Sequence, residues 1–170
     1  MVVEVDTSIQ GITELLASLA RVNYLDARGD AETGRDLVAR VLAAPGEGFY
    51  YARDGVRDTW SAFTRLRETV KPGKPIRCDC EDQAAAYLAG LRLLYPSRRL
   101  YAVVSQPKQG AMAHAYTALD VPDAFSAPRV DNYMTAPPIG FAGAGEPGWA
   151  PSPMTIPFPV VAKAAASSVH

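Results

Sequence analysis

The sequence has few of the residues that build disulfide scaffolds and metal centres, with only two cysteines and two histidines among 170 residues. Cys78 and Cys80 are separated by one residue, so a disulfide between them would be badly strained. A zinc site would have to combine both with His114 and Asp131, whereas structural zinc sites prefer four cysteine or histidine ligands in paired motifs. The composition therefore excludes a disulfide scaffold and disfavours zinc.

Long apolar runs and an excess of charge of one sign are also missing. The net charge of −1 gives no basic footprint for nucleic acid. No apolar run approaches the length of a membrane span. Residues 1–6 show no basic n-region and no cleavage site, so we expect no secretion signal. These absences predict a protein without nucleic-acid or membrane partners, kept in the cytoplasm or carried in a virion assembled there.

The residues that are present predict a globular domain whose first part is helical. Hydrophobic residues make up 48% of the chain, enough for one domain with a core. Helical spacing of apolar residues predicts one helix capped by Thr7 or Ser8, a polar connector over 26–30, and a second helix over 33–44. A third helix is expected over 59–70, capped by Asp58. The inward stripes of the first two helices are Ile9, Ile12, Leu15, Leu16, Leu19 and Val22, and Leu37, Val38, Val41 and Leu42.

A fourth helix is predicted between Asp79 and Pro96, and it carries the most informative residue of the chain. Its apolar stripe consists of Ala84, Tyr87, Leu88, Leu91 and Leu94. Asp79 is a suitable N-cap, and the carboxylates of Glu81 and Asp82 suit the positive end of the helix dipole. Cys80 is then placed at a helix N-terminus, where backbone N–H groups lower the pKa of a thiol. Nucleophilic cysteines are usually held at such a position.

Downstream residues supply the partners that a nucleophilic cysteine needs. Strands are expected over 100–105, 113–119 and 129–133, separated by turn residues. His114 lies on the second strand and Asp131 on the third. Nucleophile, base and orienting carboxylate then follow in chain order as Cys80, His114 and Asp131. Helices followed by an antiparallel sheet indicate an α+β fold.

These residues carry a resemblance to a known family. The run Asp79-Cys80-Glu81-Asp82-Gln83-Ala84, followed by His114-Ala115 and Val130-Asp131-Asn132, resembles the transglutaminase-like cysteine peptidase superfamily. The most similar branch is that of the bacterial transglutaminase-like cysteine proteinases, and the resemblance spans roughly residues 58 to 135. Trp60 stands where that branch usually has a tryptophan. Cys78 and Gln83 stand where it usually has a glycine and an aromatic residue.

The resemblance implies a papain-like core, in which the nucleophile helix packs on the sheet that bears the histidine and the aspartate. It also implies a Cys80–His114–Asp131 triad that acts on a protein substrate, with Trp60 as a wall of the substrate cleft. Periplasmic peptidases of this branch bind calcium next to the cysteine, which here would involve Asp79 and Glu81. The alternative is that these carboxylates only cap the helix and pair with arginine.

The last part of the chain differs in composition and defines a second region. Seven prolines lie between residues 137 and 159. We therefore divide the chain into a domain over 1–135, made of a helical part (1–57) and the Cys-His-Asp core (58–135), and an extended arm over 136–170. The arm is expected to pack through Phe141, Trp149 and Phe158 on its own domain or on a neighbouring chain. Its presence favours the alternative function, a non-catalytic virion or assembly protein of phage type.

Overall fold

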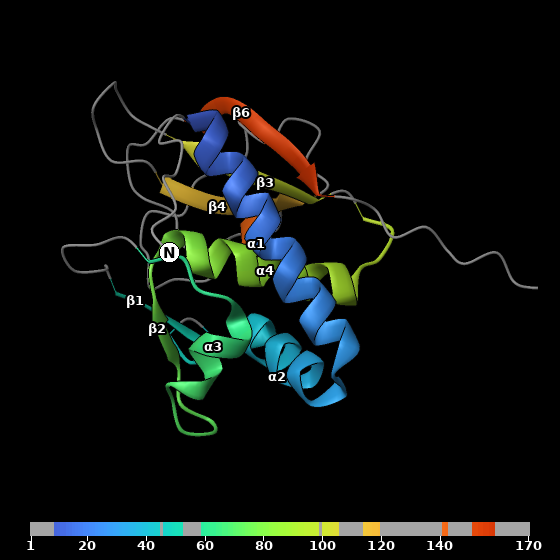
Figure 1. Cartoon of the computed structure of the whole chain (residues 1–170), viewed down its shortest axis with the longest axis vertical. Coiled ribbons are helices and arrows are strands. Elements are labelled where there is room, and N and C mark those ends of the chain that lie inside the picture. The colour runs from blue at the N-terminus through green and yellow to red at the C-terminus, as the bar shows by residue number, and fades with distance from the viewer. Residues whose placement is uncertain are drawn as a thin grey trace, which may run out of the picture.

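The structure is a computed structural model, and it describes residues 9–44, 46–52, 59–98, 100–105, 114–119, 141–142 and 151–158. These residues form an α+β fold (Figure 1). Its helices are α1 (Ile9–Gly29), α2 (Ala31–Leu42), α3 (Phe63–Glu68) and α4 (Cys80–Leu94). Its strands are β1 (Phe49–Tyr51), β2 (Ile76–Cys78), β3 (Leu100–Ser105), β4 (His114–Leu119), β5 (Phe141–Ala142) and β6 (Pro151–Phe158).

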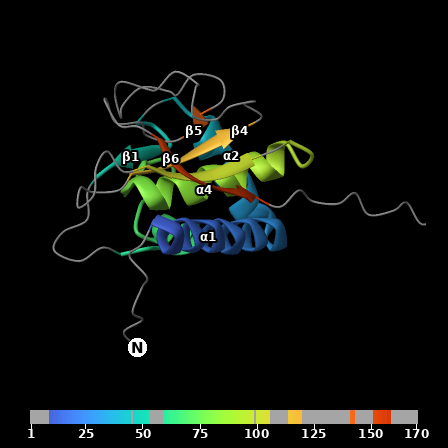
Figure 2. The same ribbon diagram turned by 90° about the horizontal axis from the view of Figure 1, so that it is seen from above.

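Helix α4 lies between the other helices and the larger sheet. It contacts α1 and α2 on one side and β4 and β3 on the other, and Figure 2 shows it between α1 and β4. Helix α1 also reaches β3 and β6. Among the helices that the structure describes, no helix is both long enough and apolar enough to cross a membrane. The α+β class predicted from the sequence is confirmed.

Helix α1 is longer than predicted, and its inward stripe matches the predicted one in part, because Leu16 is buried and Ile12 and Leu19 pack against the core. Its buried positions recur every three or four residues, as an amphipathic helix requires, and they are Thr13, Leu16, Ala20, Asn23 and Ala27. The predicted inward residue Val22 is 46% exposed. The polar connector over 26–30 is also wrong, because α1 continues to Gly29 and Asp30 caps α2 by accepting the Thr33 N–H.

Helix α2 follows its predicted pattern except at its last residue. Leu37 and Val41 are buried, whereas Leu42 is 62% exposed and so does not point inward as predicted. Gly90 allows α2 and α4 to approach closely, since a Cβ there would lie 2.7 Å from Val41 Cγ2.

Helix α3 begins at Phe63 rather than at Thr59, and its N-terminus is capped from another helix. Its N-cap residue, Ala62, has no side chain that can accept a hydrogen bond. Asn23 of α1 supplies the missing acceptor, because its Oδ1 accepts the Phe63 N–H at 2.8 Å. The predicted cap, Asp58, lies outside the described residues.

A parallel pair of short strands precedes α4. Phe49–Tyr51 forms β1 and pairs with β2, a strand that the sequence did not predict. The Ala52 N–H continues the pairing by donating to the Cys78 carbonyl at 3.0 Å. This pairing fixes the chain immediately before Cys80.

The larger sheet has the strand order β5-β4-β3-β6. Strands β3 and β4 form the predicted antiparallel pair, with Leu100 opposite Leu119 and Ser105 opposite His114. Two pieces of the proline-rich region join it, β6 next to β3 and β5 next to β4. The third predicted strand, 129–133, and the anchor Trp149 lie outside the described residues. The division at residue 135 stays a prediction.

The cap that α1 supplies to α3 should be measurable. In Asn23→Leu, the buried Phe63 N–H loses its acceptor, which costs about 1–3 kcal/mol of unfolding free energy. Urea unfolding measures this loss. Arg21→Leu, at an exposed position of the same helix, is the control and should change stability far less. An equal loss in both variants would contradict the capping role.

Candidate functional site

The two cysteines lie on either side of the junction between β2 and α4, in different environments. Cys78 is the last residue of β2 and is only 4% exposed. Cys80 is the first residue of α4 and is half-buried. The predicted placement of Cys80 at a helix N-terminus is confirmed. Cys80 is therefore the more accessible of the two thiols.

Within the part of the chain that the structure describes, two groups interact with the Cys80 thiol. The thiol donates to Glu81 Oε2 at 3.2 Å. From β4, a backbone hydrogen bond of the Ala115 N–H lowers the pKa of the Cys80 thiol. Ala115 follows His114 in β4, so the first residues of that strand lie beside the thiol. The sulfur thus has one acceptor for its proton and one donor for its lone pairs.

The surroundings of Cys80 favour the neutral thiol over the thiolate. Burial raises the pKa of the Cys80 thiol well above its reference value of 9.0, and the charge of Glu81 raises it further. The Ala115 N–H lowers this pKa, while the hydrogen bond to Glu81 and the charge of Asp79 raise it. The lowering of the thiol pKa that we expected from the N-terminus of α4 is therefore outweighed, and Cys80 rests as a thiol.

The acidic residues around Cys80 have separate structural roles. Asp79 holds the predicted N-cap position, but its side chain makes no capping hydrogen bond, which corrects the prediction. Asp82 Oδ1 accepts the Ser61 N–H at 2.8 Å. This bond ties the residue after Trp60 to the first turn of α4. Trp60 itself is partly buried against the core. The segment of Trp60 and the start of the Cys80 helix are thereby joined.

The remaining predicted site residues are placed only in part. His114 lies on the second predicted strand and is the first residue of β4, while Asp131 lies outside the described residues. The convergence of Cys80, His114 and Asp131 stays a prediction. Within the described ranges, no three metal-ligating side chains of the His, Cys, Asp or Glu type gather. Since calcium takes six to eight oxygens, Asp79 and Glu81 would need further ligands from elsewhere.

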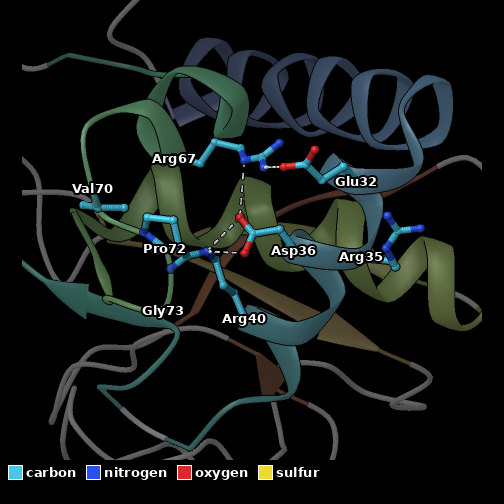
Figure 3. Close-up of a pocket in the computed structure, with 8 residues that line it drawn as sticks. All are labelled: Glu32, Arg35, Asp36, Arg40, Arg67, Val70, Pro72 and Gly73. Atoms are coloured by element: carbon cyan, nitrogen blue, oxygen red, sulfur yellow. Dashed lines mark hydrogen bonds and ion pairs between the residues drawn. The ribbon is translucent and has the colours of Figure 1, made fainter.

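A separate pocket of about 400 Å³ lies between α2, α3 and the following loop (Figure 3). Its charged groups mostly pair with one another: Arg67 bonds to Glu32 at 2.8 Å and approaches Asp36 at 3.4 Å. Arg40 Nε bonds to both Asp36 oxygens, and its Nη1 donates to the carbonyls of Gly48 and Lys74. The pocket is lined by Glu32, Arg35, Asp36, Arg40, Arg67, Val70, Pro72 and Gly73.

This charged cluster joins three segments rather than forming a reactive centre. Buried Arg40 links α2 to the chain before β1 and to the loop before β2. Sequence reasoning missed it, because arginines spaced along a helix predict a solvated face. The pocket lining includes neither Cys78 nor Cys80.

Comparisons of the chain with protein-family models, with curated proteins and with solved structures found no match.

The role of Arg40 predicts a large loss of stability on its removal. In Arg40→Met, the carbonyls of Gly48 and Lys74 lose their donor and Asp36 keeps only Arg67 as an ionic partner, so unfolding should become easier by about 2 kcal/mol or more. Arg35→Met, on the exposed side of the same helix, is the matched control and should cost less than about 0.5 kcal/mol. Urea unfolding of both variants measures these losses of stability. If Arg40→Met lost as little stability as Arg35→Met, Arg40 would not link the three segments.

The contact between Cys80 and Glu81 predicts a pH effect. A raised pKa leaves less thiolate at a given pH, so alkylation of Cys80 should continue to accelerate above pH 9.0. Glu81→Gln removes the neighbouring charge and should shift this rise to lower pH. Well below the pKa, each unit of lowering increases the thiolate fraction about tenfold.

Iodoacetamide kinetics between neutral and alkaline pH measure this shift in a Cys78→Ser background. Glu14→Gln, on the exposed face of α1, serves as a charge-matched control and should leave the profile in place. If alkylation of Glu81→Gln depended on pH in the same way as alkylation of the parent Cys78→Ser protein, Glu81 would not be the group that holds the thiol proton.

Proposed function

We propose that this protein is a thiol acyl-transfer enzyme, a cysteine peptidase or amidase that acts on protein substrates. Cys80 is the nucleophile, His114 the general base and Asp131 the group that orients the imidazole. One observation carries the proposal: Thr117 Oγ1 of β4 donates to the Ala84 carbonyl in the first turns of α4 at 2.9 Å, so the strand that begins with His114 runs along the start of the Cys80 helix. The Ala115 N–H lowers the pKa of the Cys80 thiol through a backbone hydrogen bond, and the Cα of His114 is about 3.8 Å from that of Ala115.

The packing around α4 supports the papain-like arrangement that the resemblance implies. Helix α4 contacts β4 and β3 of an antiparallel pair. Thr117 strengthens this contact, because its Oγ1 donates to the Ala84 carbonyl at 2.9 Å. A nucleophile at the helix start and a base at the strand start would then share one end of the interface. Trp60, whose segment Asp82 ties to α4, would form a wall of the cleft.

The protonated resting thiol makes a general base necessary. Since burial and Glu81 hold the proton on sulfur, His114 must remove it as the sulfur attacks. The S–C bond forms while the π electrons of the carbonyl move to oxygen. When the carbonyl re-forms, the C–N bond breaks and the amine takes the proton from the imidazolium. The resulting thioester passes its acyl group to water, or to another nucleophile.

A second candidate function follows from the same thiol. A thiol whose pKa is raised also suits a domain that has kept the fold and lost the chemistry. In that case the protein would be a non-catalytic virion or assembly component of phage type, and its C-terminal arm would bind partners. The raised pKa of the Cys80 thiol and the hydrogen bond from this thiol to Glu81 are the observations that favour this candidate.

Acylation of the pure protein separates the two candidates. We predict that a fluorescent activated acyl ester modifies Cys80, located by peptide mapping, and that Cys80→Ser abolishes the product while Cys78→Ser does not. His114→Ala should slow acylation by about 10²–10⁴-fold, the usual contribution of a general base. Asp131→Asn should slow it as well.

His170→Ala removes the other histidine of the chain and should leave acylation unchanged. Equal labelling of both cysteines, unaffected by His114→Ala, would sink the catalytic proposal and leave the assembly role.

A further inference from the structure

The prolines of β6 determine which way the backbone groups of the sheet point. Pro157 lies opposite Tyr101 in the β3–β6 pairing. Proline has no N–H, so this pair cannot be one of the hydrogen-bonded pairs of an antiparallel ladder. The N–H and C=O of Tyr101 must therefore point to the other side, toward β4.

Along β3, the backbone N–H and C=O groups of successive residues point alternately toward β4 and toward β6. The direction at Tyr101 therefore fixes the direction at the other residues of β3 and at their partners in β4. If Tyr101 faces β4, then Val103 and Ser105 also face β4, and Val104 faces β6. Val104 is the partner of Ala115, and the two strands keep one register throughout. Ala115 and Val104 thus form a non-hydrogen-bonded pair, in which the Ala115 N–H points away from β3. Thr117 has the same direction and meets Ala142 of β5 there.

The direction derived from the register agrees with the contact at the thiol. Thr117, two residues further along β4, is hydrogen-bonded to Ala84 in the first turns of α4, which places Ala115, only 3% exposed, beside the start of that helix. There the Ala115 N–H, turned away from β3, lowers the pKa of the Cys80 thiol through a backbone hydrogen bond. The backbone N–H of Cys80 itself also lies at the start of α4. Cys80 is the first residue of α4, so its own N–H has no acceptor within the helix. The N–H groups of Ala115 and Cys80, from distant parts of the chain, thus both lie at the start of α4.

We infer that the backbone N–H of Ala115 is a catalytic group, which forms an oxyanion hole together with the N–H of Cys80. This inference rests on the proposed acyl transfer. The sulfur attacks the carbon that bears the carbonyl oxygen, so a donor that reaches the sulfur is also within reach of that oxygen. As the π electrons move to oxygen, the Ala115 N–H transfers its hydrogen bond from sulfur to the oxyanion.

Replacing the amide of Ala115 by an ester tests this role. Incorporation of lactic acid in place of alanine removes the N–H and keeps the methyl side chain. Each protein is then treated with the activated acyl ester and, separately, with iodoacetamide, whose displacement at a saturated carbon forms no oxyanion. The ester at Ala115 should slow acylation by about 10²–10³-fold, the usual loss for one oxyanion donor. Alkylation should fall far less.

Ala118 provides the matched control, because it is an alanine of the same strand that takes the same replacement. Its pair with Tyr101 is hydrogen-bonded in this register, so its N–H faces β3 and away from Cys80. The ester at Ala118 should leave acylation nearly unchanged, even though it removes a bond of the sheet.

Two conventional substitutions at Ala115 provide a second test of the same role. Ala115→Pro removes the N–H at a position where no ladder bond is lost, and Ala115→Val keeps the N–H while adding similar bulk. Only Ala115→Pro should slow acylation selectively. If the ester at Ala115 slows acylation and alkylation by one common factor, or slows neither, the oxyanion role is wrong and the acyl-transfer proposal stands. A wild-type protein that is not acylated at Cys80 would instead refute the proposed function.

Discussion

Helix α4 packs between α1, α2 and the sheet, and its small side chains set how closely these elements approach. Ala84, Ala85, Ala86, Ala89 and Gly90 are all buried or in close contact with neighbours. Enlarging such side chains typically costs about 1–3 kcal/mol, because surrounding elements must move. The same packing places the first turn of α4 against the start of β4. The position of the candidate nucleophile is thus a consequence of how the core is filled.

Polar groups at the two ends of α4 hold the helix in this position. At the start, Asp82 binds the Ser61 N–H and Gln83 donates to the Cys78 carbonyl. At the end, fully buried Arg92 donates to the carbonyls of Tyr95, Pro96 and Arg98, where a cation also suits the helix dipole. Burial at the first turn raises the pKa of Cys80, so the position that orients the thiol also keeps it protonated.

Periodicity predicted the elements that bury one apolar face, namely the four helices and the strands β3 and β4. It could not predict what depends on distant partners. The α3 N-terminus starts late because its cap, Asn23, comes from α1, and β2 exists because β1 pairs with it. At the site, chain order indicated Cys80 and His114, but the Ala115 N–H has no side-chain signature. Its direction depends on a register that includes Pro157 of β6.

The central claim is that the register of the sheet brings the Ala115 amide to the Cys80 thiol. Nuclear Overhauser spectroscopy of the ¹⁵N-labelled protein tests it directly, without relying on activity. The account predicts a cross-peak between the Ala115 amide proton and the Cys80 β protons, together with slow exchange of the Ala118 amide in the sheet. A cross-peak from the Tyr116 amide in its place would show that the strand is shifted by one residue, and would contradict the account.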